Sequence, residues 1–466
     1  MPLRQRHDTI AAIATPVGEG GISVIRVSGE KAISICNSLF SGGKPLLAAS
    51  SHTIHFGHFI DANGKMIDEV LASVFRAPHS YTGEDSVEIS CHGGMYLANL
   101  VLATILHQGA RMADPGEFTL RAFLNERMDL TQAEAVAALI QAKTEKAHGA
   151  SLAQLSGILT QRIEGFRKEL IHLCSLLELE LDFSQEGIEL TKKDDVVQQL
   201  DKLITDIREL LASYQYGRIL RDGVKVVLTG KPNAGKSSLL NLLLQQNRAI
   251  VSDIPGTTRD IIEENLSING LLVRLVDTAG IRQSEDMIEE ESVRRTHEQV
   301  NSASVIVVIV DGSVEITADD KNLYQNLLQS ARKNKSAVIF LLNKSDIVNP
   351  NFHFDITLFS NESQMSVSCL TGAGISEFKQ KLFQVSLPDY DSLSSSVLLQ
   401  NERHKVALEK TTDRLQLARQ TLIDNLSGDF VAVDLRAALD YLGEIIGITT
   451  PDDILQNIFS KFCIGK

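Results

Sequence analysis

The sequence lacks any apolar run long enough to cross a bilayer, for which a helix needs about 20 residues. The longest candidate, residues 305–310, has the length and β-branched composition of a core strand. The segment from Met1 to Asp8 is followed only by a short apolar stretch that Pro16 interrupts, so we expect no signal peptide. These features predict a soluble, cytoplasmic protein with no membrane partner.

Cysteine is also scarce. The chain has five cysteines, which are scattered and never stand in C-x-x-C spacing. This argues against a disulfide framework or a structural zinc site and favours a reducing compartment. Positive charge is in deficit, and a formal net charge of −14 argues against a protein whose whole surface binds nucleic acid. A role with nucleic acid would need a local basic patch or a basic partner.

A chain of 466 residues is too long for one ordinary core, and about two to four domains are expected. Residues 1–119 carry short β-rich runs and are predicted to be α+β. Two glycine pairs in this region, Gly20-Gly21 and Gly93-Gly94, indicate either close approach of the backbone to a ligand or tight packing.

From residue 120 onward the apolar residues recur at helical spacing, which predicts a long helical run from Leu130 to about Leu181. Thr131 and Glu134 fit a capping box at the start of this run. Another helix is expected at residues 194–214. These patterns predict a helical bundle rather than a loop.

Residues 218–384 alternate between strand and helix patterns, which predicts a doubly wound α/β domain. Helical patterns return in residues 385–466, where Thr450 fits the cap of the last helix. The α/β domain is therefore predicted to be inserted between two halves of one helical domain, 120–217 and 385–466. The strands are expected at 224–229, 271–276, 305–310, 338–342 and 365–368, and the last helices at 403–424, 434–446 and 451–462.

The stretch from Gly230 to Ser237 matches the phosphate-loop template, two glycines with four residues between them followed by Lys-Ser. A β-branched run precedes it and a helical pattern follows it, which argues against a Gly-rich turn that matches by chance. In this context backbone N–H groups and a helix N-terminus surround a phosphate. Lys236 is expected to reach the β- and γ-phosphates, and Ser237 to ligate Mg²⁺.

Two further motifs follow at positions suited to Mg²⁺ and the γ-phosphate. The segment 256–260 supplies a second hydroxyl to Mg²⁺, for which we favour Thr258. Asp277 ends a predicted strand and can hold Mg²⁺ through water, while Gly280 can donate its N–H to the γ-phosphate.

Two more motifs point to the base. A carboxylate at Asp346 can accept both N1–H and N2–H of guanine, which adenine lacks, so it selects GTP over ATP. The segment 368–370 completes the pocket through backbone groups. The nucleotide-binding residues predicted from all five motifs are Asn233, Ala234, Gly235, Lys236, Ser237, Ser238, Ser252, Asp253, Ile254, Pro255, Gly256, Thr257, Thr258, Asp277, Thr278, Ala279, Gly280, Asn343, Lys344, Asp346, Ser368, Cys369 and Leu370.

The residue after Gly280 is Ile281, whereas Ras places a Gln that orients the attacking water just past this motif. An apolar side chain cannot orient water, so another residue must. The acidic stretch 285–291 lies within reach if the loop reorders, although for most of its residues a solvated helix start is the alternative. A monovalent cation between the phosphates would do the work of an arginine finger if Asn233 and loop carbonyls coordinate it.

These five motifs, in a domain inserted into a helical domain and preceded by an α+β domain, resemble the tRNA modification GTPase MnmE (TrmE) family. The resemblance extends over essentially the whole chain through segments that generic GTPases do not share. They are Asp8-Thr9-Ile10 with Ala14-Thr15-Pro16, Tyr81-Thr82-Gly83-Glu84-Asp85, Cys91-His92-Gly93-Gly94, the run from Pro115 to Asn125 that continues into 129–135, and Phe462-Cys463-Ile464-Gly465-Lys466.

The resemblance implies a multidomain α/β and α fold with an α+β folate-binding N-terminal domain, a helical bundle and an inserted Ras-like P-loop GTPase domain. The N-terminal domain would form a homodimer. Arg26, Glu88, Arg127 and Lys466 would contact a 5-formyl- or 5,10-methylene-tetrahydrofolate. With an FAD-dependent MnmG partner, in a heterotetramer or larger complex, the protein would add an aminomethyl or carboxymethylaminomethyl group to C5 of the wobble uridine of certain tRNAs.

The resemblance also implies that GTP hydrolysis depends on K⁺ and on G domains that meet across the dimer. Asn233, Ser252, Ile254 and Thr257 would form the K⁺ site, and Glu289 would orient the hydrolytic water. Two residues, Glu19 and Glu126, depart from the family pattern near the folate region.

Cys463 admits two interpretations, a buried structural thiol at a helix end or a thiol presented to folate or tRNA. The function also has a rival, a GTP-dependent switch in ribosome assembly with no chemistry of its own. The folate-type N-terminal domain and the C-I-G-K end favour the tRNA-modifying enzyme.

Overall fold

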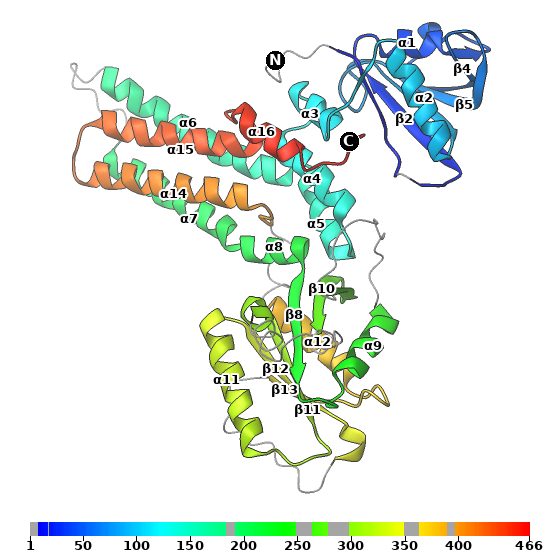
Figure 1. The fold of residues 1–466 in the computed structure, drawn as a ribbon. Coiled ribbons are helices and arrows are strands. Elements are labelled where there is room, and N and C mark those ends of the chain that lie inside the picture. Colours follow the sequence, from blue (N-terminus) through cyan, green and yellow to red (C-terminus); the bar gives the residue numbers. More distant parts are fainter. Residues whose placement is uncertain are drawn as a thin grey trace. The chain divides into compact units, whose positions relative to one another are not determined.

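The computed structural model describes residues 8–16, 18–182, 192–247, 263–277, 298–348, 363–388 and 397–466 (Figure 1). Two compact units make up the chain, and neither is continuous in sequence. The first comprises residues 1–137, 154–201 and 410–466, and the second comprises 138–153 and 202–409. Among the described residues, no helix is both long and apolar enough to span a membrane.

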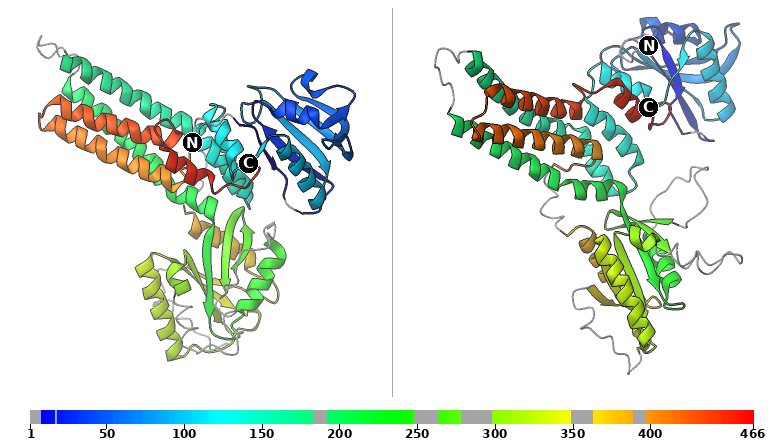
Figure 2. Two further views of the ribbon diagram at one scale, coloured as in Figure 1. Left: turned by 45° about the horizontal axis from the view of Figure 1, so that its top comes forward. Right: turned by 60° about the vertical axis from the view of Figure 1, so that its left-hand side comes forward.

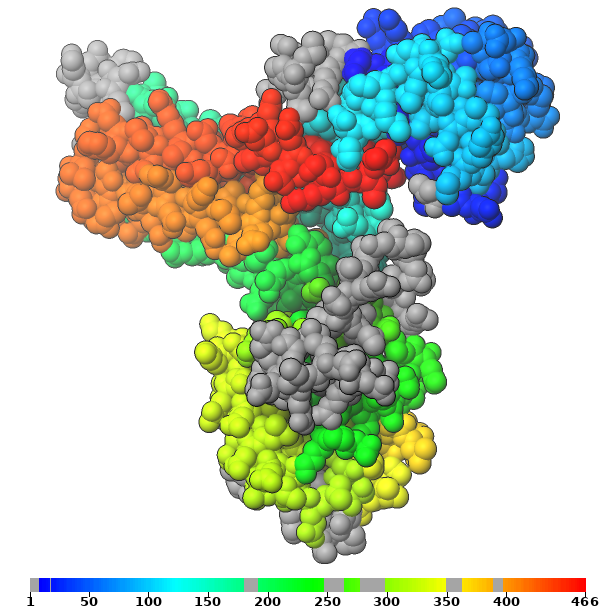
Figure 3. All heavy atoms as spheres, viewed as in Figure 1, coloured from blue at the N-terminus to red at the C-terminus, as the bar shows by residue number. Residues whose placement is uncertain are grey.

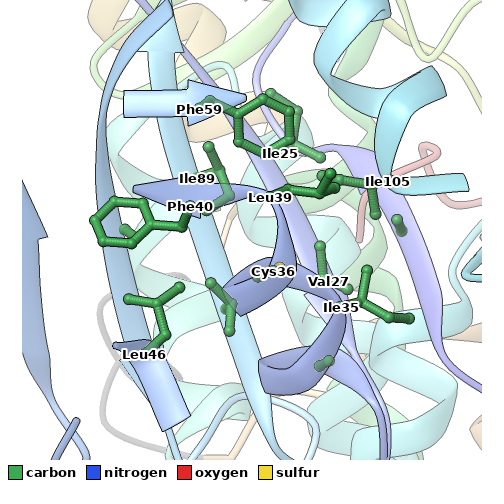
Figure 4. Close-up of a cluster of buried hydrophobic side chains, with 14 of the residues drawn as sticks. Ile25, Val27, Ile35, Cys36, Leu39, Phe40, Leu46, Phe59, Ile89 and Ile105 are labelled. Carbon is green, nitrogen blue, oxygen red and sulfur yellow. The ribbon is translucent and has the colours of Figure 1, made fainter. Parts of the chain in front are cut away.

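A seven-stranded sheet in the order β3-β4-β5-β6-β2-β1-β7 begins the first unit. Its strands pair antiparallel except for β1 and β7, which are parallel. Helices α1 (Ala32–Ser38) and α2 (Met95–His107) bury their apolar sides with one face of this sheet, and Figure 4 shows part of that core. The strands are β1 (Ile10–Ile13), β2 (Ile22–Ser28), β3 (Phe40–Gly42), β4 (Thr53–Ile60), β5 (Met66–Phe75), β6 (Ser86–His92) and β7 (Arg111–Met112).

One residue of the two glycine pairs, Gly93, is required by close packing. The backbone N–H of Gly20 donates to the carbonyl of Gly93 over 2.9 Å. A Cβ placed on Gly93 would lie 2.2 Å from the carbonyl oxygen of Gly20, so no larger residue fits there without a shift. Tight packing, one of the two interpretations of these glycines, therefore accounts for Gly93, whereas a Cβ on Gly20 would come no closer than 3.9 Å to the carbonyl oxygen of Ile22.

Helices form the rest of the first unit, and Figures 1 and 2 show α6 and α15 running side by side. Arg419 on α14 pairs with Asp201 on α7 over 2.5 Å, and Arg436 on α15 pairs with Glu178 on α6 over 2.6 Å. The helices of this part are α3 (Glu117–Leu124), α4 (Leu130–Gln141), α6 (Ile158–Asp182), α7 (Lys193–Ala212), α14 (Glu402–Ile423), α15 (Gly428–Ile446) and α16 (Asp452–Phe459).

The predicted long run from Leu130 is three helices, because α5 (Glu145–Leu155) lies between α4 and α6. Thr144 starts α5 by accepting a hydrogen bond from the N–H of Ala147, and Gly157 separates α5 from α6 in a left-handed conformation with φ of 85°. The apolar period continues across both breaks, so periodicity alone does not reveal them.

The capping box predicted from Thr131 and Glu134 is wrong. The carboxylate of Asp129 accepts from the backbone N–H groups of Thr131 and Gln132, and the side chain of Gln132 accepts from the N–H of Asp129. This is the same reciprocal arrangement, moved two residues toward the N-terminus.

Other helix ends also differ from the prediction, and α15 starts at Gly428 rather than at residue 434. The helix expected at 194–214 ends at Ala212, and a separate helix, α8 (Tyr214–Asp222), follows it. Helix α16 starts one residue after Pro451, and Thr450 does not cap it, because the Thr450 hydroxyl donates to the carbonyl of Glu444.

The second unit contains a six-stranded sheet in the order β13-β12-β11-β8-β10-β9. All neighbours are parallel except β9 and β10, which form a hairpin. Apolar clusters on both faces, under α9 and α12 on one side and α11 on the other, confirm the doubly wound α/β prediction. The elements are β8 (Val224–Gly230), α9 (Lys236–Asn247), β9 (Glu263–Ile268), β10 (Leu271–Asp277), β11 (Val305–Asp311), α11 (Ala318–Asn334), β12 (Ala337–Asn343), β13 (Ser363–Ser366) and α12 (Ile375–Ser386).

Candidate functional site

The predicted phosphate loop lies between the end of β8 at Gly230 and the start of α9 at Lys236. Three of its residues have positive φ: Gly230 at 146°, Asn233 at 63° and Gly235 at 104°. A Cβ on Gly230 would lie 2.3 Å from the carbonyl oxygen of Ile309 on the neighbouring strand β11, so this position requires glycine. Turns of this kind aim successive backbone N–H groups into one concavity, which suits an anion.

Lys236 begins α9 and is 8% exposed. Its Nζ donates to the carbonyl oxygens of Gly230 over 2.9 Å and Lys231 over 2.7 Å, so the ammonium group closes the loop on itself. Ser237 and Ser238 follow in the first turn and are exposed. The loop is also anchored from outside, because Lys231 pairs with the buried Asp320 on α11 over 2.5 Å.

Asn343, the last residue of β12, connects the phosphate loop to the predicted base pocket. Its Nδ2 donates to the carbonyl of Ala234 over 2.8 Å, and its Oδ1 accepts from the N–H of Cys369 over 3.1 Å. The side chain is buried and both ends of the amide are satisfied. Segments more than 100 residues apart in sequence are thus joined through one residue.

The residues around Asn343 hold the base segment in shape. Ser368 donates to Oδ1 of Asp346 over 2.5 Å, which leaves the other carboxylate oxygen of Asp346 for a ligand. Lys344 has a left-handed backbone with φ of 63°, and its Nζ contacts Oδ2 of Asp311 over 2.6 Å. Burial alone would raise the pKa of Asp311, but hydrogen bonds from Lys344 and Ser313 outweigh it and hold the pKa below its usual value.

Cys369 contacts Asn343 through its backbone N–H rather than through its thiol. Burial raises the pKa of this thiol to about 11, so the sulfur stays protonated at neutral pH. Leu370 is largely exposed beside it.

Several predicted residues lie outside the described part of the chain. They are Ser252, Asp253, Ile254, Pro255, Gly256, Thr257, Thr258, Thr278, Ala279, Gly280 and Glu289, together with the side chain of Asp277 at the end of β10. Among the residues that the structure does describe, no group of three or more His, Cys, Asp and Glu residues forms a metal-binding cluster.

A second polar site lies on the sheet of the first unit, where Arg26 on β2 and Glu88 on β6 occupy paired positions. Nε of Arg26 donates to Oε1 of Glu88 over 2.9 Å. The guanidinium carbon lies 4.8 Å from the centre of the Tyr81 ring and 5.6 Å from that of Phe118, which are cation–π distances. Nη1 of Arg26 is buried and has no hydrogen-bond partner in the described structure, which leaves a donor for a ligand.

Tyr81 is itself held in place. Its hydroxyl shares a hydrogen bond of 2.8 Å with Thr119, and burial raises the pKa of the phenol, so the ring stays neutral. Ser80, the preceding residue, accepts a hydrogen bond from Nε of Arg127 over 3.3 Å. The structure thus brings Arg127 to the segment that supports Arg26.

The C-terminal residues reach the same sheet, and Figure 3 shows the red C-terminal atoms against the cyan region of α3. Phe459 and Phe462 pack in a cluster with Leu120, and Gly116 donates its N–H to the carbonyl of Cys463 over 3.4 Å. A Cβ on Gly465 would lie 2.3 Å from the carbonyl oxygen of Ile13, on β1. Lys466 therefore follows directly after a residue packed on the strand next to β2.

Sequence reasoning assigned no role to a buried ionic cluster beside this site. Glu117 and Arg121 are nearly inaccessible, and Arg121 contacts Glu117, Asp8 and Glu84 at 3.0, 2.7 and 3.2 Å. Arg111 joins Asp8 and Glu117 at 2.7 and 2.6 Å. The signal that could have revealed this cluster is the presence of charged residues inside an otherwise apolar helix, α3. The ionic cluster holds the Tyr81–Asp85 segment in place, because Arg121 pairs with Glu84.

Cys463 is exposed, and the part of the chain around it is anchored through backbone contacts. The interpretation of this residue as a buried structural thiol is therefore wrong. The thiol is exposed three residues before Lys466, which the resemblance assigns to folate.

Comparisons with known proteins cover nearly the whole chain. The model of the MnmE helical domain matches residues 130–463, and the model of the GTP-binding protein TrmE N-terminus matches residues 9–127. The tRNA modification GTPase MnmE of Carboxydothermus hydrogenoformans is 44% identical over 465 residues, which cover 99% of this chain and 100% of the relative. The tRNA modification GTPase MnmE of Syntrophus aciditrophicus is 45% identical over 461 residues, which cover 98% of this chain and 99% of the relative. The solved G domain of the FeoB iron transporter of T. maritima covers 35% of this chain and 98% of its own, at 24% identity and a TM-score of 0.26, a likeness too slight to bear on fold or function.

Proposed function

The chain belongs to the MnmE family of tRNA modification GTPases, and from this membership we propose the finer function of its sites. It is a GTP hydrolase that takes part in tRNA modification. With an FAD-dependent MnmG partner it adds an aminomethyl or carboxymethylaminomethyl group to C5 of the wobble uridine of certain tRNAs. The one-carbon unit comes from a tetrahydrofolate derivative.

Four segments divide this work: an N-terminal folate-binding and dimerisation domain (1–119), two halves of a helical domain (120–217 and 385–466) and an inserted GTPase domain (218–384). Two observations support the division. One family model ends at residue 127 and the other begins at residue 130, which supports a domain boundary in this region of the chain. The mostly parallel sheet lies wholly within residues 224–366, which follow α7 and precede α14 in the sequence.

The GTP site is supported by the joining of its two halves through Asn343. Because Asn343 binds Ala234 and Cys369 together, phosphate and base are recognised at a fixed separation. Asp346 has one oxygen bound to Ser368 and accepts the guanine N–H groups with its carboxylate. Ser237 at the start of α9, with Thr258, holds the Mg²⁺ that neutralises charge on the phosphates.

Folate binding is carried by one observation, the buried and unpartnered Nη1 of Arg26. A buried donor without a partner costs about 1–3 kcal/mol, and a ligand acceptor such as a carboxylate or ring carbonyl would remove that cost. Glu88, partly exposed next to it, is suited to the amino-pyrimidine edge of a pterin. Arg127 and Lys466 add positive charge for the glutamate tail, and the exposed thiol of Cys463 stands three residues before Lys466 in the sequence.

For catalysis, Asn233 with Ser252, Ile254 and Thr257 holds K⁺, and Glu289 orients the water. The left-handed backbone of Asn233 turns this residue out of the loop, where it is exposed. Two G domains of a homodimer meet to complete this site. A comparison of GTP turnover in KCl and NaCl at equal ionic strength tests the cation, and equal rates would contradict it.

The whole function is tested by mass spectrometry of wobble nucleosides from a strain that lacks this protein. We expect the C5 modification to disappear and to return when the wild-type chain is supplied. Arg26→Met is expected to fail in this rescue while its GTP turnover stays near that of wild type. Unchanged C5 modification in the deleted strain, together with defects in ribosomal subunits, would instead support the rival assembly switch.

A further inference from the structure

The hairpin of β9 and β10 connects two nucleotide-sensing segments of the GTPase motif set. β9 starts at Glu263, just after the motif that contains Thr258, and β10 ends at Asp277, where the next motif begins. The turn between them consists of Asn269 and Gly270, with φ values of 50° and 77°. Any displacement of either strand along its axis also displaces this turn, because the two strands are hydrogen-bonded over their whole length.

Helix α5 rests on that turn with its first residues. If Gly270 had a Cβ, it would lie 3.1 Å from Cγ of Lys146, so the methylene stem of this lysine packs on the Gly270 backbone. Nζ of Lys146 lies 5.3 Å from the centre of the Phe383 ring on α12. One turn later on the same helix face, Ala150 packs against the apolar core under the sheet. The start of α5 is thus fixed to the GTPase domain by three contacts.

The other end of α5 is fixed to the beginning of α4. Nε2 of the buried Gln154 donates to the carbonyl of Thr131 over 2.9 Å, and Nε2 of Gln132 donates to the carbonyl of Leu155 over 3.1 Å. Gln132 is also half of the cap in which Asp129 is the other half. Asp129 stands two residues after Arg127, which the proposed function places at the folate site.

The boundary between the two compact units falls inside α5, between Ala153 and Gln154. A helix of 11 residues is about 16 Å long and nearly incompressible along its axis, because each residue is hydrogen-bonded within it. A movement imposed on Lys146 at one end therefore arrives at Gln154 rather than being absorbed between them. Thr131 and Gln132 at the start of α4 would be displaced first, and Gln132 would pass the displacement to Asp129.

We propose that α5 transmits the nucleotide state of the GTPase domain to the folate site, and that Lys146 is the positioning residue through which it does so. This regulation rests on the proposed function, because it names what the GTP cycle controls. The β9–β10 turn is the part that responds to the nucleotide (the input), and the Asp129 cap with Arg127 is the part whose position changes at the folate site (the output). By thermodynamic reciprocity, folate bound at the output must in turn change the affinity for nucleotide at the input.

The test is amide hydrogen exchange of the full-length protein with Mg²⁺ and K⁺, in GDP and in GDP with fluoroaluminate. In wild type we expect exchange of residues 127–134 to differ about fivefold or more between the two states. Lys146→Ala removes the stem from Gly270 and should reduce that difference below about twofold, while residues 224–247 respond as in wild type. GTP turnover should stay within about twofold of wild type, since Lys146 does not belong to the nucleotide site.

Lys143→Ala is the matched control, because Lys143 is an exposed lysine three residues before Lys146 and outside α5. It should respond as wild type does. Gly270→Asn alters the other partner of the same contact. Asparagine tolerates positive φ, and its side chain would occupy the space where the stem of Lys146 packs. Gly270→Asn replaces Lys146→Ala if that variant does not fold. A wild-type chain with equal exchange in both states, or a folded variant with the full response, would overturn the proposal.

A separate titration with 5-formyl-tetrahydrofolate keeps the failure of this proposal distinct from failure of the proposed function. If no folate binds in either nucleotide state, the folate function is wrong, and the exchange experiment still decides whether α5 transmits the signal. If folate binds equally in both states while exchange differs, the signal reaches α4 without regulating folate. That result would also overturn the proposal.

Discussion

The side-chain amide of Asn343 donates a hydrogen bond to the backbone carbonyl of Ala234, with a distance of 2.8 Å between Nδ2 and the oxygen. This bond ties the segment expected to read guanine to the loop expected to hold the phosphates. The same amide accepts from Cys369, so three motifs from three strand–loop connections are coupled in one hydrogen-bonded unit. Asn343 therefore acts on the geometry of the whole nucleotide site even though it was predicted only as one of its lining residues.

Asn343→Ala should weaken guanine nucleotide binding and destabilise the fold. The variant leaves the buried carbonyl of Ala234 and the partly buried N–H of Cys369 without these partners, and each loss costs at most about 1–3 kcal/mol. Urea denaturation and titration with a fluorescent GDP analogue measure the two effects. Asn334→Ala is the control, because Asn334 is an exposed asparagine whose bond to Asn301 lies on the surface. Nucleotide affinity that is the same in both variants would contradict the assigned role.

Gly235→Ala should abolish nucleotide binding while it lowers the free energy of unfolding only modestly. The φ of 104° disfavours any side chain, and the new Cβ would lie 2.0 Å from Nδ2 of Asn343. Either the loop or Asn343 must move, and both belong to the nucleotide site. Gly165→Ala, in the interior of α6 with open space around it, should instead stabilise the protein by about 0.5–1 kcal/mol. Calorimetry with and without GDP separates these outcomes.

The sequence can indicate a nucleotide site because each of its motifs is short and local. In a parallel sheet the carboxyl ends of the strands meet at one edge, so motifs that follow Gly230, Asp277 and Asn343 are expected to converge. The bond between Asn343 and Ala234 was not predictable in the same way. It depends on the register of β11 between β8 and β12, which no local pattern specifies.

The helical part shows a different limit. Thr131 and Asp129 are both good caps, and each has an acid or amide three residues later, so sequence alone offers two registers. Asp129 is selected by a tertiary contact, because its second oxygen also accepts from Thr160 on α6. The contact of Lys146 with Gly270 is likewise tertiary, and nothing in the composition of α5 indicates it.

Glu117→Ala should be among the most destabilising single changes in the first unit. Its carboxylate accepts from Arg111 at 2.6 Å and Arg121 at 3.0 Å, and it is only 2% exposed. Removing one partner of a buried ionic cluster leaves uncompensated charge and costs about 3–5 kcal/mol. Glu164→Ala, at an exposed position on α6, should change stability by less than about 0.5 kcal/mol. Denaturant unfolding followed by circular dichroism compares the two, and equal small losses would show that the cluster relaxes.

Glu289→Ala tests the residue expected to orient the water. Orientation matters mainly in the transition state, so turnover should fall by about a hundredfold while GTP affinity stays nearly unchanged. Glu285→Ala, in the same acidic stretch, should keep most of its turnover. A large loss of affinity in Glu289→Ala would point to a structural role, and comparable turnover in the two variants would place the water-orienting residue elsewhere.

Asp8→Asn should show how stability depends on pH at the ionic cluster. A hydrogen bond from Arg111, reinforced by Arg121, outweighs burial and lowers the pKa of Asp8 to about 2. Because the pKa is lower in the folded chain than in the unfolded one, Asp8 stabilises the fold above its ordinary value of 3.8. That contribution is lost as the pH falls from there toward 2.

We therefore expect wild type to exceed Asp8→Asn in unfolding free energy at pH 7 by about 1 kcal/mol, a value reduced for the partial exposure of Asp8. The difference should shrink below pH 4 and vanish near pH 2. Urea unfolding at a series of pH values measures it, with Asp413→Asn, at an exposed position on α14, as the control. A difference that stays constant across this range would mean that Asp8 contributes through packing or neutral hydrogen bonds rather than through its charge.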